Sequence, residues 1–507
     1  MWKLILGAFS ASGIVGLGVL LNAVPPVTAL NLSMAQESTP PPTALVHLFE
    51  WTWADIAAEC ETYLGPNGYQ AVQISPPQEH IILPDFGYPW WQRYQPVSYQ
   101  LESRSGSRAD LQAMIDRCRA AGVAIYADAV INHMAGFEEG VGSAGTEFTK
   151  YEYPDLYGPE DFNDCRQQVT DYGDAENVTQ CELVGLADLD TSSQQVQTTL
   201  VDYMGELVEM GVAGFRIDAA KHIRNTELGE ILARLRDRYP DTDIYIYQEV
   251  IDPGTEAIRK QDYYDSGHVI DFKYGYFMGK AFLGLGGQTL ANLETLGEGW
   301  GLAPSEQAVV FIDNHDKQRG HGGGGDYLTY HSGDLYALAN VFMLGFPYGK
   351  AQVMSSYAFD DSEQGPPADA DGSTRPVYQT GEANCFGEWV CEHRWPAISG
   401  MVGFRNATQA VAEVTDWWSN QANQIAFGRG DLGFVAINRE AEPLTHTFQT
   451  QLPQGRYCNV VQGSLVADGT ACANDAQVVL VNRLGQFTAT LPEMTALAIH
   501  AEAKLSR

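Results

Sequence analysis

Residues 212–222 read VAGFRIDAAKH, a short apolar run that carries Arg216 and Asp218 ahead of Lys221 and His222. Its apolar residues are typical of a buried β-strand. Residues two apart on a strand share a face, so Arg216 and Asp218 point together while their apolar neighbours point away. Such a pair is either a buried ion pair at a strand end or part of a functional site, and the rest of the chain has to decide.

Seven further runs of this kind occur, and helical patterns lie between most of the eight. The strand runs are 44–49, 69–75, 122–131, 212–218, 243–250, 268–272, 308–313 and 351–356. The expected helices are 54–64, 108–121, 192–211, 226–239, 275–286 and 334–344. Nearly continuously apolar strands that alternate with helices predict a parallel (β/α)8 barrel of the TIM type, with a doubly wound open sheet as the alternative.

Two segments depart from this alternation. Residues 132–189 are rich in Gly, Pro and Asp and have no good helical pattern, which predicts a subdomain inserted after the third strand. Residues 418–507 contain short alternating strands and turn residues, which predict a C-terminal all-β sandwich domain. The barrel is therefore expected to comprise residues 44–131 and 190–417.

The N-terminal segment has the pattern of a targeting sequence. Lys3 precedes a mostly apolar run over 4–24 and a small-residue site near 33–35, which predicts a signal peptide over 1–35 and secretion to an extracellular or periplasmic space. An uncleaved anchor is the alternative, because the run approaches the ~20 residues that span a bilayer. Residues 36–43 are Pro-rich and are expected to form a linker.

All eight cysteines follow this leader, and an even number in an exported chain predicts four disulfides. None of them forms a Cys-x-x-Cys metal or redox spacing. The pairs that lie close in sequence are Cys165–Cys181, Cys385–Cys391 and Cys458–Cys472, which leaves Cys60 with Cys118. The sequence alone does not prove this connectivity.

The composition limits the classes of partner. A chain of 507 residues that is 45% hydrophobic is expected to form a globular protein of two or three domains. Its formal net charge of -34 repels nucleic acid and anionic membranes, so neither is expected as a partner. An acidic surface suits a neutral substrate.

Acidic residues follow several of the expected strands at the end where barrel loops surround one opening: Asp218, Glu249, Asp313 and Asp316. Glycoside hydrolysis needs one carboxylic acid to protonate the departing oxygen and one carboxylate across the sugar, and a separation of ~5 to 5.5 Å gives retention. We expect Arg216 to keep Asp218 ionised as a nucleophile. Glu249, near another carboxylate and apolar walls, should hold its proton longer.

The chain resembles the α-amylase family (glycoside hydrolase family 13). Four segments match its signatures: DAVINH (128–133), VAGFRIDAAKH (212–222), IYQEVID (246–252) and FIDNHDKQRGHG (311–322). Other segments resemble the animal-type and related bacterial α-amylases: VHLFEW (46–51), VQISPPQEH (72–80), PWWQRYQPVSY (89–99), CELVGLADLD (181–190), FKYG (272–275), QVMSSY (352–357), WVCEHRW (389–395) and FGRG (427–430). The resemblance covers residues 44 to about 503.

This resemblance implies a role for each matched residue. Asp218 matches the nucleophile, Glu249 the general acid and base, and Asp316 the third acid, which binds sugar hydroxyls. The other residues matched to substrate binding are Trp90, Trp91, Tyr94, Gln95, His133, Arg216, Lys221, His222, Glu256 and His315.

The resemblance also implies a calcium site. The matched ligands are the side chains of Asn132 and Asp188 and the main-chain oxygens of Thr179 and His222. These are oxygen donors, which Ca²⁺ prefers. They would join the inserted subdomain to the barrel.

A chloride site is not expected. Animal-type enzymes often bind chloride through two basic residues and an Asn, which Arg216 and Asn314 match in part, but the second basic position is Gln352. A neutral side chain there halves the positive charge available to an anion. Lys350 lies two residues away along the strand and is therefore displaced.

Together these matches imply a secreted, monomeric, calcium-dependent, endo-acting α-amylase that hydrolyses internal α-1,4 bonds of starch, glycogen and maltooligosaccharides with retention. A transglycosylase on the same scaffold is one alternative. A non-catalytic amylase-like binding module is another, although such modules usually lack the acids that are all present here.

Overall fold

The computed structural model describes residues 44–506, which belong to one compact unit. The predicted signal peptide (1–35) and linker (36–43) lie outside the described residues. Within the described part of the chain, no helix is both long enough and apolar enough to cross a membrane.

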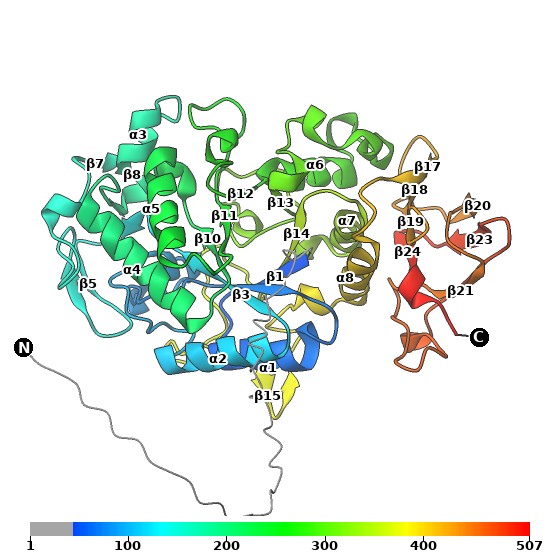
Figure 1. Cartoon of the computed structure of the whole chain (residues 1–507), viewed down its shortest axis with the longest axis horizontal. Coiled ribbons are helices and arrows are strands. Elements are labelled where there is room, and N and C mark those ends of the chain that lie inside the picture. Colours follow the sequence, from blue (N-terminus) through cyan, green and yellow to red (C-terminus); the bar gives the residue numbers. More distant parts are fainter. Residues whose placement is uncertain (1–43, 507) are drawn as a thin grey trace, which may run out of the picture. The chain divides into compact units, whose positions relative to one another are not determined.

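The eight predicted strands form one closed parallel barrel (Figure 1). They are β1 (Ala44–Leu48), β2 (Ala71–Ile74), β3 (Ala124–Ala129), β10 (Gly214–Ile217), β11 (Tyr245–Gln248), β12 (His268–Ile270), β13 (Ala308–Phe311) and β14 (Lys350–Ser355). Each pairs with its neighbours in chain order, and β1 closes the ring against β14. The predicted (β/α)8 barrel is therefore confirmed, and the open sheet is excluded.

Helices cover the outside of the barrel where the sequence predicts them (Figure 1). They are α1 (Trp53–Glu59), followed by a π-helical turn over Cys60–Leu64, α2 (Arg108–Ala120), α4 (Gln194–Met210), α5 (Asn225–Arg238), α6 (Phe272–Leu283) and α7 (Asp334–Gly345). A further helix, α8 (Pro396–Thr408), was not predicted. It begins with Pro396 at its first position, where a missing N–H costs nothing.

The inserted segment consists of short paired strands. They are β4 (His133–Met134) with β9 (Ala187–Asp188), β5 (Glu139–Val141) with β6 (Glu147–Thr149), and β7 (Cys165–Gln168) with β8 (Cys181–Glu182). The expectation that this segment has no helix is wrong, because α3 (Ala175–Gln180) lies within it. Asp174 starts this helix by accepting a hydrogen bond from the backbone N–H of Glu176.

The C-terminal region is all β, as predicted. A four-stranded sheet contains β17 (Thr415–Ser419), β18 (Gln424–Arg429), β19 (Gly433–Asn438) and β24 (Thr495–His500). Two-stranded sheets pair β20 (Leu444–Gln449) with β23 (Gln486–Leu491) and β21 (Gly455–Cys458) with β22 (Val478–Val481). The rings of Phe434, Phe448 and Phe487 pack together between these sheets. Another short pair, β15 (Tyr378–Gln379) and β16 (Glu382–Ala383), lies in the loop after β14.

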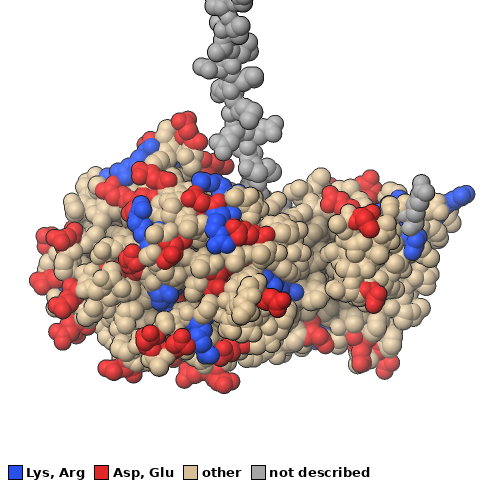
Figure 2. All heavy atoms as spheres, turned by 90° about the horizontal axis from the view of Figure 1, so that it is seen from below, with Lys and Arg blue, Asp and Glu red and all other residues tan. Residues whose placement is uncertain are grey.

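Four disulfides form with the predicted pairing: Cys60–Cys118, Cys165–Cys181, Cys385–Cys391 and Cys458–Cys472. The first connects the segment after α1 to α2, and the second joins β7 to β8 in the insertion. On the face in Figure 2, acidic side chains are scattered rather than gathered into one patch.

A buried carboxylate fixes the first barrel helix to the loops after β14. Glu59 accepts hydrogen bonds from Arg394 (2.7 and 2.6 Å), from the Tyr378 hydroxyl (2.6 Å) and from His393 Nε2 (2.8 Å). Burial raises the pKa of Glu59, but the bonds from His393 and Arg394 outweigh it and hold the pKa at about 2. Glu59 therefore stabilises the fold fully above about pH 4.5, and this contribution is lost as the pH falls towards 2.

Replacing Glu59 by Gln should lower the free energy of unfolding at pH 7 by about 3 kcal/mol, because it leaves buried donors without a charged acceptor. The difference from wild type should shrink as the pH falls below about 4.5. Urea unfolding from pH 7 to pH 3 with disulfides intact measures both effects. The matched control is Glu61→Gln, whose exposed pair with Arg117 is worth less than about 1 kcal/mol. An equal loss of unfolding free energy in both variants, or a loss that does not depend on pH, would contradict this role of Glu59.

Candidate active site

The carboxyl ends of the barrel strands open into a cleft of about 920 Å³. Nearly all the predicted catalytic and substrate-binding residues line it: Trp90, Trp91, Tyr94, Gln95, His133, Asp218, Lys221, His222, Glu249, Glu256, His315 and Asp316. Arg216, 2% exposed, is not among the lining residues. Residues from the segments after β3, β10, β11 and β13 therefore meet at one opening, where barrel chemistry is usually placed.

Arg216 binds three carboxylates from three adjacent strands. Its Nη1 lies 2.6 Å from Asp128 Oδ1 and 2.7 Å from Asp218 Oδ1, and its Nη2 lies 2.9 Å from Glu249 Oε2. The barrel register explains this convergence, because Arg216 pairs with Asp128 on β3 and with Tyr247 on β11. The pair noted in the sequence, Arg216 and Asp218, does point to one face.

The structure corrects the predicted division between the two acids. Arg216 contacts both Asp218 and Glu249, so it cannot by itself keep one ionised and the other protonated. Burial raises the pKa of Asp218 and of Glu249, and Arg216 opposes the rise in each. One cation among several carboxylates leaves an excess of negative charge, which favours retention of a proton within the cluster.

Each of the two acids uses one oxygen for anchoring. Asp218 Oδ1 accepts from Arg216, and Glu249 Oε2 accepts from the backbone N–H of Ala219 at 2.9 Å in addition to its contact with Arg216. Among the described residues, no hydrogen bond reaches Asp218 Oδ2 or Glu249 Oε1. These two oxygens therefore remain for a substrate in the cleft.

Asp128 was missed as a functional residue, although its segment was part of the resemblance. It is fully buried and also accepts from the Tyr94 hydroxyl (3.0 Å) and Gln73 Nε2 (3.3 Å). Burial raises the pKa of Asp128 to about 6, against the effect of Arg216. Only the pairing of β3 with β10 reveals its place beside Arg216.

The two predicted histidines are held in different ways. His133 Nε2 bonds to the Tyr94 carbonyl at 2.9 Å, and burial lowers the pKa of His133 to about 4. The His315 ring stacks on Tyr94 and on Phe49, each at 5.0 Å between centroids, and burial lowers its pKa well below the ordinary value. Both rings are therefore neutral near pH 7 and can exchange hydrogen bonds with hydroxyl groups.

The two acids after β13 have different surroundings. Asp316 lines the cleft, and burial raises its pKa. The expectation that Asp313 faces the same mouth is wrong, because its carboxyl accepts from the Tyr336 hydroxyl and from Gln318 Nε2, both at 2.7 Å, inside the protein. Lys317 follows Asp316, and its ammonium binds the carbonyl oxygens of the glycine loop 320–325.

Lys221 and Glu256 also line the cleft, and they form an ion pair. Lys221 Nζ also donates to the carbonyl of Ile251 at 2.6 Å and lies 4.8 Å from the centroid of the Tyr172 ring. His222 Nδ1 bonds to the carbonyl of Val178 at 2.9 Å. These contacts connect the loop after β10 to the inserted segment.

On the aromatic wall, Trp90 is 5% exposed and donates its Nε1–H to the carbonyl of Ser362 at 2.9 Å. Trp91 is more exposed, which fits the expectation that two adjacent tryptophans cannot both point inward. Other lining residues were not anticipated: Phe137, Glu138, Tyr172, Leu183, Val184, Leu186, Ile251 and Glu363. Several come from the inserted segment, whose path over the barrel has no signal in the sequence.

The matched calcium ligand Asp188 lies in a buried, polar position between the barrel and the insertion. Asp188 is 3% exposed, its carboxylate lies between the side-chain nitrogens of Asn163 (2.7 Å) and Asn132 (3.4 Å), and burial raises its pKa well above the usual value. An amide can present its oxygen in the place of its nitrogen, so Asn132 is compatible with a cation next to Asp188. Among the described residues, no three His, Cys, Asp or Glu side chains gather around a metal position. The ligand set implied by the resemblance instead comprises one carboxylate, one amide and the main-chain oxygens of Thr179 and His222.

Beside Arg216, the two other positions matched to a chloride site, Asn314 and Gln352, are neutral amides. Gln352 Nε2 donates to Gln73 Oε1 at 2.6 Å, and Asn314 Oδ1 accepts from the backbone N–H of Lys317 at 2.8 Å. Lys350 does not replace the missing basic residue, because its ammonium lies 3.1 Å from His268 Nε2 at the start of β14.

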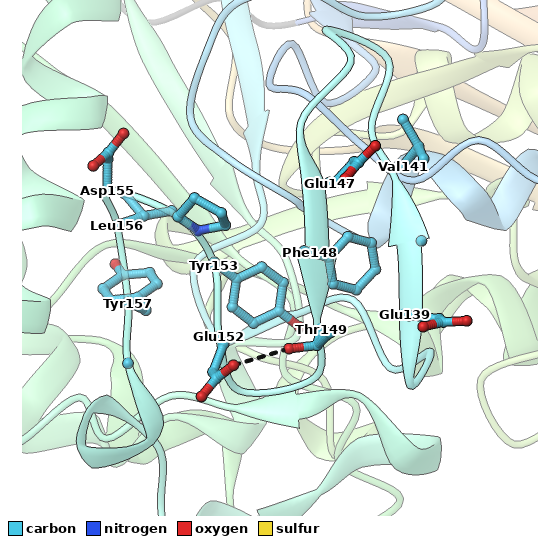
Figure 3. A pocket seen from close by; sticks show the side chains of 13 residues that line it. Glu139, Val141, Glu147, Phe148, Thr149, Glu152, Tyr153, Asp155, Leu156 and Tyr157 are labelled. Atoms are coloured by element: carbon cyan, nitrogen blue, oxygen red, sulfur yellow. Dashed lines mark hydrogen bonds between the residues drawn. The ribbon is translucent and has the colours of Figure 1, made fainter.

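A second hollow, of about 820 Å³, lies on the inserted segment (Figure 3). The β5–β6 hairpin and the loop 152–158 line it, with the stacked rings of Phe148 and Tyr153 at 5.2 Å. It contains none of the predicted site residues.

Comparisons with known proteins agree with this site. Residues 62–275 match the family described as the α-amylase catalytic domain, and residues 417–502 match the α-amylase C-terminal all-β domain. The α-amylase of Tribolium castaneum is 46% identical over 474 residues, which are 91% of this chain and 94% of that protein. Pancreatic α-amylase 2a5 of Mus musculus is 42% identical over 486 residues, 91% of this chain and 95% of that protein.

Solved structures give the same result. Wild-type α-amylase I from Eisenia fetida superposes with a TM-score of 0.84 at 42% identity, covering 91% of this chain and 98% of that one. A mutant of that enzyme, solved as a complex with maltohexaose, also has a TM-score of 0.84, at 41% identity over the same shares of the two chains. The chain belongs to the α-amylase family, and it is a glycoside hydrolase.

Proposed function

We propose that this enzyme is an endo-acting, retaining α-amylase that cleaves internal α-1,4 bonds of starch, glycogen and maltooligosaccharides. The observation that carries this proposal is the shared guanidinium, which holds one oxygen of Asp218 at 2.7 Å and one of Glu249 at 2.9 Å. Two carboxyls anchored on one planar group suit the ~5 to 5.5 Å separation of retaining enzymes better than the ~6.5 to 9.5 Å of inverting ones.

The reaction follows from the two remaining oxygens. Glu249, protonated on Oε1, gives its proton to the glycosidic oxygen as that bond breaks, while Asp218 Oδ2 attacks the anomeric carbon and forms a glycosyl ester. Glu249 then takes a proton from water, which displaces Asp218 and restores the original configuration. Asp316 binds sugar hydroxyls beside this centre, and the neutral rings of His133 and His315 add further hydrogen bonds.

The remaining matched residues are proposed to orient the chain of sugars. Trp90, Trp91, Tyr94 and Gln95 form an aromatic platform against which glucose rings pack. Lys221, His222 and Glu256 bind the units just beyond the scissile bond. The cleft, of about 920 Å³, has room for several sugar units around the acids, which favours cleavage within a chain.

We also propose that the enzyme is exported and monomeric, with the barrel over 44–131 and 190–417, the insertion over 132–189 and the C-terminal domain over 418–507. The four disulfides support an oxidising compartment. The net charge of -34 supports a neutral polysaccharide substrate rather than nucleic acid.

Replacing Asp218 by Asn should lower kcat/KM on amylose by about 10⁴-fold or more, because the amide cannot form the ester. Wild type should release a range of mid-length oligosaccharides early in an amylose digest, as product sizing would show. The matched control is Asp313→Asn, an isosteric change at the neighbouring acid outside the cleft, which should keep activity. Activity that survives in Asp218→Asn, or early release of one short product alone, would overturn the proposal.

We propose a structural Ca²⁺ held by the side chains of Asn132 and Asp188 and the main-chain oxygens of Thr179 and His222. It would neutralise the buried Asp188 carboxylate and connect the insertion to the barrel. A chelator should lower the Tm of wild type by a few degrees, and added Ca²⁺ should restore it. In Asp188→Asn the Tm should no longer respond to either addition. An identical response in both proteins would rule out this ligand set.

We propose that turnover needs no chloride, because Gln352 supplies no second positive charge beside Arg216. Adding chloride to an anion-free preparation should change kcat by less than about two-fold when sulfate keeps the ionic strength constant. A several-fold increase with chloride, but not with sulfate, would count decisively against this.

A further inference from the structure

The cleft wall carries an aromatic residue that none of the assigned contacts uses. Phe137, in the inserted segment, lies next to Trp91 with its ring plane 9° from the indole plane and 6.4 Å between centroids. Phe86 packs edge-on against both, at 6.2 Å from Trp91 and 5.8 Å from Phe137. Phe86 is 60% exposed, so this three-ring cluster reaches the surface.

The backbone holds Phe137 in this position. The N–H of the preceding residue, Gly136, donates to Gln95 Oε1 at 3.0 Å. A Cβ on Gly136 would lie 2.6 Å from the carbonyl oxygen of Gly185, so the two loop segments approach as closely as they do only because this residue is glycine. On the other side, the carbonyl of Glu138 accepts from the backbone N–H of Lys150 at 2.9 Å. Phe137 is therefore fixed rather than carried on a loose loop.

We propose that Phe137, supported by Phe86, forms an additional sugar-binding subsite that continues the platform of Trp91 and packs against one more glucose unit of an α-glucan. This deepens the proposed function and rests on it. Phe137 and Trp91 line the same cleft and present nearly parallel faces, and an extended glucan offers repeated apolar ring faces to such a surface. The acidic surface disfavours an anionic occupant.

An extra subsite acts only on substrates long enough to reach it. Binding energy from a remote unit raises kcat/KM for long chains and adds nothing for short ones. The ratio of kcat/KM for maltoheptaose to kcat/KM for maltotriose therefore reports on this subsite. A general structural defect would lower both values together.

The test measures this ratio, and the sizes of early amylose products, in Phe137→Ala and Phe137→Tyr. The alanine variant should lower the ratio roughly three- to ten-fold and change the product sizes, because one stacking contact is lost. The tyrosine variant should keep the wild-type ratio, since its ring presents the same face. Phe86→Ala should give a smaller decrease, because its ring supports Phe137 from the edge.

The control is Phe386→Ala, which removes an exposed ring (68%) that does not line the cleft, and it should leave the ratio unchanged. A wild-type ratio in Phe137→Ala, or an equal decrease in Phe386→Ala, would overturn the subsite while leaving the amylase assignment intact. Failure of wild type to cleave any of these substrates would instead overturn the proposed function.

Discussion

The contact between one buried guanidinium and three carboxylates is the constraint on which the active site depends. Arg216 is 2% exposed, and a charge so far from water requires close partners. Its partners are Asp128, Asp218 and Glu249. Together the three carboxylates can carry more negative charge than Arg216 can balance. Their mutual repulsion therefore favours one retained proton, which a general acid needs. The same contact that stabilises the buried arginine therefore supports the acid role proposed for Glu249.

The closed barrel determines which oxygens remain available. Just past the ends of β10 and β11, the backbone N–H of Asp218 donates to Ala129 and that of Glu249 to Ile217, both at 3.0 Å. These bonds continue the parallel ladder by one residue on each strand and fix the two main chains side by side. Each side chain then reaches Arg216 with one oxygen, and the other is left for substrate. An open sheet with the same strands would not bring β1 and β14 together to close the opening.

The strands were predictable because each is a short, nearly continuous apolar run, and Asp218 and Glu249 were predictable because they follow such runs. Three features were not. Asp128 depends on the register between β3 and β10, which no single strand encodes. Asp313 differs from Asp316 only through contacts with Tyr336 and Gln318 from other segments. The helix α3 and the ring of Phe137 lie in the insertion, where fold is set by tertiary contacts rather than by periodicity.

The interior of the barrel supports the proposal that turnover needs no chloride. Gln73 Oε1 accepts from Gln352 (2.6 Å) and from the Tyr247 hydroxyl (2.8 Å), while Gln73 Nε2 faces Asp128 at 3.3 Å. The neutral amides of Gln73 and Gln352 thus hydrogen-bond to each other, and Gln73 also donates to Asp128. Arg216 directs its positive charge to the three carboxylates that it contacts. A second basic side chain in place of Gln352 would be buried close to Arg216 and would need a counter-ion. A bound chloride would then stabilise the fold of the site itself.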